Sequence, residues 1–134
     1  MADILLDTGF LYALADQDDD HHSRSKAVLA QVTKEDSLVL PNFLLAETHT
    51  VINKRLGPQA AKAFLNAAIQ DYHVERVTSE DEMAAHALLQ EVSRSRDFSY
   101  FDAAACAVAL RLGIERVFTF DRHFQQLGFE ILKR

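Results

Sequence analysis

Short apolar runs recur along the chain and predict the strands of a sheet. The first run consists of Ile4, Leu5 and Leu6 and ends at Asp7. Runs of about four to eight residues bounded by polar or turn residues are typical of buried strands. The pattern predicts four or five such strands in all. The others are expected at Leu38 to Leu40, stopped by Pro41, and then at Val74 to Val77, Val117 to Phe120 and Phe129 to Leu132.

Stretches with helical spacing separate these runs. One apolar stripe recurs at intervals of three and four residues, which places its members on a single helix face. It consists of Ala61, Phe64, Leu65, Ala68 and Tyr72. Pro58 stands just ahead of the stripe, where proline suits the first turn of a helix. A second helix is expected to carry Val28, Leu29 and Val32 on its inner side, and short helices are expected at 10–16 and after Asp121.

End signals delimit the remaining helices. Gly57 and Gly113 stand where glycine favours a helix stop, after helices expected at 42–56 and 99–112. Ser79 and Glu82 have the spacing of a capping box and predict a helix start at Ser79. That helix would carry Ala84, Leu88 and Val92 on its apolar face.

Strands and helices alternate throughout, which favours an α/β fold. We expect a mainly parallel sheet of four to five strands with helices on both faces, forming a single domain over residues 1–134. No linker, internal repeat or low-complexity segment divides the chain. In sheets of this kind, ligands bind beyond the carboxyl ends of the strands.

Composition restricts the partners and the compartment. The chain has 14 Lys and Arg against 20 Asp and Glu, a formal charge of −6, so any basic surface for nucleic acid must be local. No apolar stretch approaches the roughly 20 residues that span a bilayer, and no signal peptide is recognisable at the start. The single cysteine, Cys106, lies in an apolar run and is expected to be buried and reduced, in a cytoplasmic protein without a membrane partner.

Two acidic residues follow predicted strands directly. Asp7 comes after the first strand and Asp121 after the fourth, so both are expected at the ligand-binding edge of the sheet. An aspartate at a strand-to-helix junction is also a favoured helix N-cap. Each residue therefore has a capping interpretation beside the functional one.

Two further acids lie on helices. Glu47 is in the middle of a helix beside an apolar stripe, with Phe43, Leu44, Thr50 and Val51 as its helical neighbours and no cation among them. Uncompensated buried carboxylates are costly and usually acquire a partner or a metal. The alternative is a solvated residue at the edge of the stripe, or one paired with a distant arginine.

Asp102 has a local alternative of its own. It stands three residues after Ser99, the spacing of a capping box, so its side chain could simply reach back to the helix start. Its other helical neighbours provide no cation either.

The four acids together predict a metal site. Two carboxylates about 4 Å apart repel by roughly 4 kcal/mol at an effective dielectric constant of 20, so a cluster attracts a divalent cation. Ligation by oxygen atoms and water suits Mg²⁺ or Mn²⁺ better than Zn²⁺. Such sites hydrolyse phosphodiester bonds.

The sequence resembles the PIN domains, and among them the toxin ribonucleases of VapC type. The resemblance extends over essentially the whole chain. It is carried by Leu5 to Thr8, by Leu45 to Glu47, by Phe101 to Ala105 and by Phe118 to Phe124.

This resemblance implies a divalent-metal endoribonuclease that cuts single-stranded RNA or exposed loops of structured RNA. Asp7 and Asp102 correspond to the principal metal ligands, while Glu47 and Asp121 would complete the site directly or through water. Thr8 and Thr119 match hydroxyls that support the acids. The resemblance also implies a homodimer and a cognate antitoxin protein.

Other polar residues are less specific. Asp18 to Asp20 with His21 and His22 look like a metal cluster, but a solvated loop or helix start is the better interpretation, because consecutive residues rarely converge on one ion. His123 is interpreted as a surface histidine. Arg122 alone among the cations is tied by sequence to the proposed site as a substrate contact. A solvated or ion-paired position is the default for Lys54, Arg55, Arg94, Arg96, Arg111 and Arg116.

Two other functions are weighed against the nuclease. A phosphoacceptor domain also uses strand-end aspartates, but the start lacks a dehalogenase acid pair, and no lysine follows the fourth strand before Lys133. A non-catalytic RNA-binding or scaffold PIN domain is the stronger alternative. Some PIN domains also serve in RNA processing, which is an alternative to the toxin role. Loss of the acids would indicate a scaffold, and all four are present.

Overall fold

The computed structural model describes residues 2–91 and 97–134. A five-stranded sheet runs through them in the order β3-β2-β1-β4-β5, and every neighbouring pair is parallel. The strands are β1 (Asp3–Leu6), β2 (Ser37–Pro41), β3 (His73–Glu75), β4 (Arg116–Phe118) and β5 (Glu130–Ile131). The predicted α/β fold with a parallel sheet is therefore confirmed.

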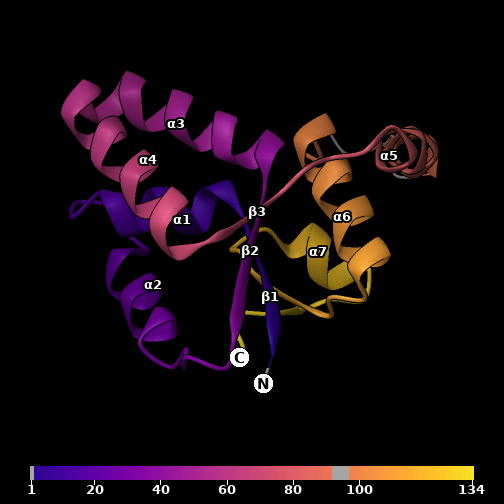
Figure 1. Ribbon diagram of the computed structural model, residues 1–134, viewed down its shortest axis with the longest axis horizontal. Coiled ribbons are helices and arrows are strands. Elements are labelled where there is room, and N and C mark those ends of the chain that lie inside the picture. Colours follow the sequence, from indigo (N-terminus) through magenta and orange to yellow (C-terminus); the bar gives the residue numbers. More distant parts are fainter. Residues whose placement is uncertain (1, 92–96) are drawn as a thin grey trace.

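Helices cover both faces of this sheet, as predicted (Figure 1). One group consists of α1 (Thr8–Ala15), α2 (His22–Leu29), α3 (Asn42–Leu56) and α4 (Pro58–Asp71). The other consists of α5 (Ser79–Glu91), α6 (Tyr100–Leu112) and α7 (Arg122–Gln126). No helix in the described part of the chain is long and apolar enough to span a membrane.

The strand order places a topological switch at β1. From β1 the chain proceeds to β2 and β3 on one side, then crosses over to β4 and β5 on the other. Loops leave the carboxyl ends of β1 and β4 in opposite directions, which opens a crevice there in parallel sheets. Asp7 follows β1 and Asp121 follows β4, so the architecture brings both acids to the same edge of the sheet.

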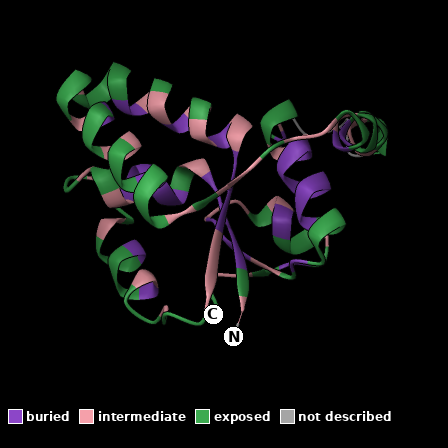
Figure 2. Cartoon of the chain, in the orientation of Figure 1, coloured by how far each residue is buried: buried purple, intermediate pink, exposed green. Residues whose placement is uncertain are grey.

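Complete burial explains why β1 has an unbroken apolar sequence. Ile4, Leu5 and Leu6 have no exposed surface, because helices cover both faces of a parallel sheet. Helix α6 is buried along most of its length, whereas α5 is mostly exposed (Figure 2). All residues from 103 to 109 in α6 are buried, including Cys106 as expected, and an apolar helix surrounded by protein is the usual result of such a sequence.

Several predicted boundaries were wrong by one or two residues. Val77 lies outside β3, because its backbone N–H donates to the side-chain oxygen of Asn42 at 2.8 Å instead of to a strand. Phe120 lies outside β4, and its ring is stacked between those of Phe10 and His21. The first helix begins at Thr8 rather than at residue 10 and ends at Ala15.

The expected capping box of α5 was also misplaced by one residue. Thr78, not Ser79, is the capping residue: its hydroxyl accepts from the backbone N–H of Asp81 at 3.1 Å. Asp81 in turn accepts from the backbone N–H of Thr78 at 2.9 Å. Asp81 therefore takes the place expected for Glu82, and Val92 lies outside the described residues.

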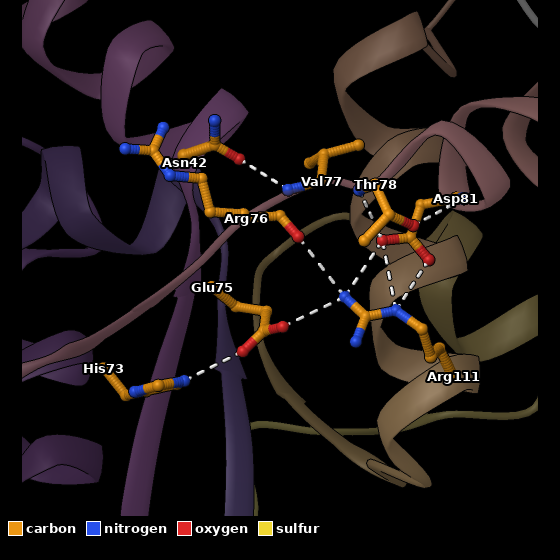
Figure 3. Close-up of polar contacts among 8 residues, drawn as sticks. All are labelled: Asn42, His73, Glu75, Arg76, Val77, Thr78, Asp81 and Arg111. Atoms are coloured by element: carbon orange, nitrogen blue, oxygen red, sulfur yellow. Dashed lines mark hydrogen bonds and ion pairs between the residues drawn. The ribbon is translucent and has the colours of Figure 1, made fainter.

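Asp81 also anchors an ion-pair network that joins three elements (Figure 3). Arg111, near the end of α6, donates to both carboxylate oxygens of Asp81 at 2.9 and 3.0 Å. The same guanidinium reaches Glu75 of β3 at 3.1 Å and the Arg76 carbonyl at 3.3 Å. Because Asp81 is only 2% exposed, this network compensates a buried charge while it connects α6 to α5 and β3.

Candidate active site

Asp7 lies directly beyond β1 and is 6% exposed. Its backbone N–H donates to the Phe118 carbonyl at 3.1 Å, which continues the β1–β4 pairing by one residue. Asp7 occupies the N-cap position of α1, but its side chain makes no capping hydrogen bond. Instead, one carboxylate oxygen accepts from the Thr119 hydroxyl at 2.6 Å. The capping interpretation of the Asp7 side chain is therefore wrong.

Thr119 connects the acids that follow β1 and β4. This residue has no exposed surface, and while its hydroxyl donates to Asp7 it accepts from the backbone N–H of Asp121 at 2.9 Å. Both hydrogen-bonding roles of the hydroxyl are thus committed between the two residues. Thr119 holds Asp7 and the backbone of Asp121 in a defined relative position.

Asp121 serves as the N-cap of α7. One of its oxygens accepts from the backbone N–H of His123 at 2.9 Å and lies 2.6 Å from the Nδ1 atom of the same histidine. The capping interpretation is correct here, and it coexists with a position beside the other acids. His123 is half-buried, with 24% of its side chain exposed. His123 lies on the short helix α7, as predicted, and its side chain is partly rather than fully exposed.

Glu47 accepts a hydrogen bond from a threonine hydroxyl rather than pairing with a cation. Thr8 donates to the Glu47 carboxylate at 2.7 Å, and the buried Thr48 donates to the Thr8 hydroxyl at 3.0 Å. The chain of hydrogen bonds joins the start of α1 to the middle of α3. Among the described residues, Glu47 has no ion-pair partner, so the alternative of pairing with a distant arginine is wrong there. The role of Thr48 had no sequence signal, because its partner is 40 residues away.

Asp102 forms the capping box suggested by its spacing. Its carboxylate accepts from the Ser99 backbone N–H at 3.0 Å, and its own N–H donates to the Ser99 hydroxyl at 3.2 Å. The residue is nevertheless half-buried in the first turn of α6. Capping and a site role are compatible, because a carboxylate has lone pairs for several partners.

Perturbed pKa values indicate that these acids converge. Burial raises the pKa of Asp7 to about 7; the hydrogen bond from Thr119 opposes this, while the charges of Asp102 and Glu47 add to it. Burial also raises the pKa of Glu47, with a further contribution from Asp102. The pKa of Asp102 is raised by burial and by the charge of Asp121. Each of the four acids therefore interacts electrostatically with at least one other.

The donor set suits a divalent cation of the magnesium type. Within residues 2–91 and 97–134, no three His, Cys, Asp or Glu side chains are arranged as a ready-made ligand cage. Mg²⁺ rarely needs one, because it keeps several water ligands and binds through only one or two carboxylates. Buried carboxylates with raised pKa values also gain free energy when a cation replaces their protons. The chemistry of the residues therefore fits such an ion.

The residues interpreted as a solvated loop do not converge. His22 uses its Nδ1 atom with the Ala13 carbonyl at 2.7 Å, whereas the His21 ring stacks on Phe120 with centroids 4.0 Å apart. The Asp19 side chain accepts from the His21 backbone. Arg122 is exposed and lines a cavity beside Asp121.

Other cations are committed elsewhere. Arg55 lies over the ring of Tyr12, and Arg111 and Arg116 form ion pairs with acids outside the site. Arg94 and Arg96 lie outside the described residues.

A family model for the PIN domain matches residues 4–130. The chain belongs to the PIN domain family. A curated PIN relative, the 23S rRNA-specific endonuclease VapC20 of Mycobacterium tuberculosis, is 33% identical over 127 residues, which cover 94% of this chain and 95% of VapC20. The crystal structure of VapC20, described as a sarcin-ricin loop cleaving toxin, superimposes with a TM-score of 0.84 over the same shares of the two chains.

More distant solved structures share the PIN fold. VapBC2 from Rickettsia felis, bound to a promoter DNA fragment, is 12% identical with a TM-score of 0.71 and 96% coverage of both chains. A toxin-antitoxin complex from Klebsiella pneumoniae is 18% identical with a TM-score of 0.64, covering 89% of this chain and 87% of the other. At this identity the similarity concerns the fold alone.

The two hydrogen bonds of Thr119 lead to a stability prediction. Thr119→Val keeps the shape of the side chain but leaves a buried Asp7 oxygen and the Asp121 N–H without their partner. We expect a loss of about 2 kcal/mol in the free energy of unfolding, measured by urea denaturation at pH 8. Thr119→Ser keeps the hydroxyl and should lose only about 1 kcal/mol of packing. A valine variant as stable as the wild type would show that these hydrogen bonds do not stabilise the fold.

Proposed function

We propose that this PIN domain is a divalent-metal-dependent endoribonuclease and the toxin of a toxin-antitoxin pair. The observation that carries the proposal is the electrostatic coupling of Asp7, Glu47, Asp102 and Asp121, in which the pKa values of the first three are raised by burial and by a neighbouring acid. Similarity to VapC20 at 33% identity over nearly the full length supports RNA as the substrate. A loop of structured RNA is the first substrate to test, because VapC20 is described as cleaving the sarcin-ricin loop.

Within this proposal, Asp7 and Asp102 would hold a Mg²⁺ or Mn²⁺ ion, and Glu47 and Asp121 would complete the site directly or through water. When bound, such an ion would lower the pKa of water and offset negative charge on the phosphate, which is the chemistry that phosphodiester hydrolysis needs. Thr119 keeps the Asp7 carboxylate in place, and the chain from Thr48 through Thr8 does the same for Glu47. Asp121 holds the neighbouring His123 imidazole through its Nδ1 atom.

The partners follow from the same family assignment. We propose a cognate antitoxin protein that restrains the nuclease, a homodimeric assembly and a location in the cytoplasm. Structures related by fold include a toxin-antitoxin complex, which supports the antitoxin, whereas the dimer and the location rest on the family resemblance. Size-exclusion chromatography with light scattering tests the dimer directly.

Metal removal is the test of the proposed activity. The wild-type protein should cleave a 23S rRNA sarcin-ricin hairpin in Mn²⁺, lose cleavage in EDTA, and regain it when Mn²⁺ or Mg²⁺ is added in excess. Gel analysis of end-labelled RNA measures the rate. The metal should also stabilise the fold by about 2.7 kcal/mol at a hundred times its Kd, measured by thermal unfolding.

Two outcomes would contradict the proposal. Cleavage that persists unchanged in EDTA would exclude the metal mechanism. Binding of the hairpin without cleavage, at several concentrations of both metals, would favour the non-catalytic RNA-binding PIN domain instead.

A further inference from the structure

A cavity of about 550 Å³ lies beside Asp121, lined by residues at the start of α2, around α7 and at β5. Phe120 and Arg122, the two chain neighbours of Asp121, both line it. His21, Arg24 and Gln125 line it as well, and Gln125 provides an amide. Its volume is in the range of pockets that hold a small ligand, about 300–1,000 Å³. The cavity thus adjoins the proposed cleavage site without containing any of its carboxylates.

The charge of this cavity is opposite to that of the rest of the protein. The chain has a net charge of −6, yet the residues lining the cavity include two arginines and no acid. Neither Arg24 nor Arg122 forms an ion pair with any residue in the described ranges. Asp20, four residues before Arg24, makes no ion pair with it there. Two guanidinium groups are therefore available to an anion, and their planar donors suit phosphate oxygens.

Aromatic rings form a second feature of the cavity. The exposed His21 imidazole stacks on Phe120 with ring centroids 4.0 Å apart and an interplanar angle of 13°. Phe120 in turn stacks on the buried Phe10 at 6.1 Å, which fixes the pair to the core. Flat rings beside cations are the combination with which proteins hold single-stranded nucleic acid, because every base has a face that stacks.

We infer that this cavity is a nucleotide subsite, in which Arg24 and Arg122 bind an RNA phosphate next to the one being cleaved and the His21–Phe120 stack receives its base. The inference rests on the proposed nuclease function and deepens it by naming where the RNA strand continues. A cluster of carboxylates repels phosphates, so a strand needs cations close to the site to remain bound. The four acids supply none, whereas the adjoining cavity supplies two.

Binding measurements in a cleavage-deficient background test the subsite. The probe is a fluorescein-labelled sarcin-ricin hairpin, and its anisotropy gives the Kd for the Asp7→Asn protein across a series of salt concentrations in EDTA. Adding Arg24→Gln should weaken binding about fivefold to tenfold and reduce the slope of log K against log salt by about 0.7, the value for one single-strand phosphate contact. Arg122→Gln should have the same two effects, on the affinity and on the slope. His21→Ala should weaken binding about fivefold without changing the slope, because it removes stacking and not a charge contact.

Lys26→Gln provides the matched control. Lys26 is exposed on the same helix as Arg24, loses the same charge and does not line the cavity, so its Kd should stay within about twofold of the parent. An Arg24→Gln effect no larger than that of Lys26→Gln would overturn the subsite, as would an absence of RNA binding at low salt. Either result leaves the metal-dependent cleavage test untouched. Conversely, a protein that binds through Arg24 but never cleaves would refute the nuclease and retain the subsite.

Discussion

Asp7→Asn should reduce metal-dependent RNA cleavage more than about 100-fold while leaving the protein folded. Loss of a residue that only orients a metal ligand typically costs about 10-fold to 100-fold, and Asp7 is proposed as a ligand itself. The amide keeps an oxygen that can accept from Thr119, so the buried hydrogen bond at 2.6 Å is retained. The measurement is the initial rate of hairpin cleavage in Mn²⁺, with circular dichroism to verify folding.

Asp3→Asn is the matched control for this substitution. Asp3 opens the same strand but is exposed, and its removal should leave the cleavage rate unchanged. Full activity in a folded Asp7→Asn protein would remove Asp7 from the metal site. Equal losses in both variants would attribute the effect to the strand rather than to the acid.

Asp7→Asn should also change the free energy of unfolding, by an amount that depends on pH. In the folded, metal-free protein the pKa of Asp7 is raised from 3.8 to about 7, chiefly by burial. A raised pKa means that Asp7 keeps its proton to a higher pH in the folded state than in the unfolded state. The stability present below pH 4 is therefore lost as the pH rises to about 7. The shift corresponds to a loss on the order of 4 kcal/mol. In EDTA, Asp7→Asn should therefore be more stable than the wild type at pH 8, and the difference should disappear near pH 4, as measured by urea unfolding.

Arg111→Ala should cause a large loss of stability from a polar contact outside the site, about 3 kcal/mol in urea unfolding at pH 7. Asp81 is only 2% exposed, and removing Arg111 leaves this carboxylate with its Thr78 capping contacts but no cation. The value is placed at the low end of the range for buried pairs because a third of the Arg111 side chain is exposed. Since α6 carries Asp102 in its first turn, cleavage should fall in parallel with stability.

Glu75→Gln is the control for this network. It removes the more exposed partner of Arg111, so the loss should stay below about 1 kcal/mol. Burial raises the pKa of Asp81, but hydrogen bonds from Arg111 and Thr78 outweigh it and hold the net pKa below its ordinary value. A carboxyl group with a lowered pKa stabilises the fold at pH values above its unfolded-state pKa, and this stability is lost as the pH falls. The difference in the free energy of unfolding between the wild type and Arg111→Ala should therefore shrink in acid. An Arg111→Ala protein as stable as Glu75→Gln would refute the role of the buried pair.

Sequence patterns alone identified the parallel α/β fold and predicted the four acids as a site. Strand and helix periods are local properties, because burial of one face imposes a repeat within each element. Asp7 and Asp121 could be placed at one edge of the sheet because each directly follows an apolar strand. The same local reasoning correctly recognised the capping roles of Asp102 and Asp121. It misplaced the cap of α5, since Thr78 and Ser79 are both good capping residues and only the position of Asp81 against Arg111 distinguishes them.

Tertiary structure alone decided how the acids are supported and what adjoins them. Thr8 meets Glu47 across 39 residues of sequence and Thr48 across 40, and Thr119 meets Asp7 across 112. His21, the residue before α2, stacks on Phe120 from a distant part of the sequence, and both line the cavity. Such contacts depend on how completed elements pack, and a hydroxyl or an imidazole has no sequence period that reveals its partner. Periodicity therefore determines which elements form, whereas their packing determines which polar groups meet.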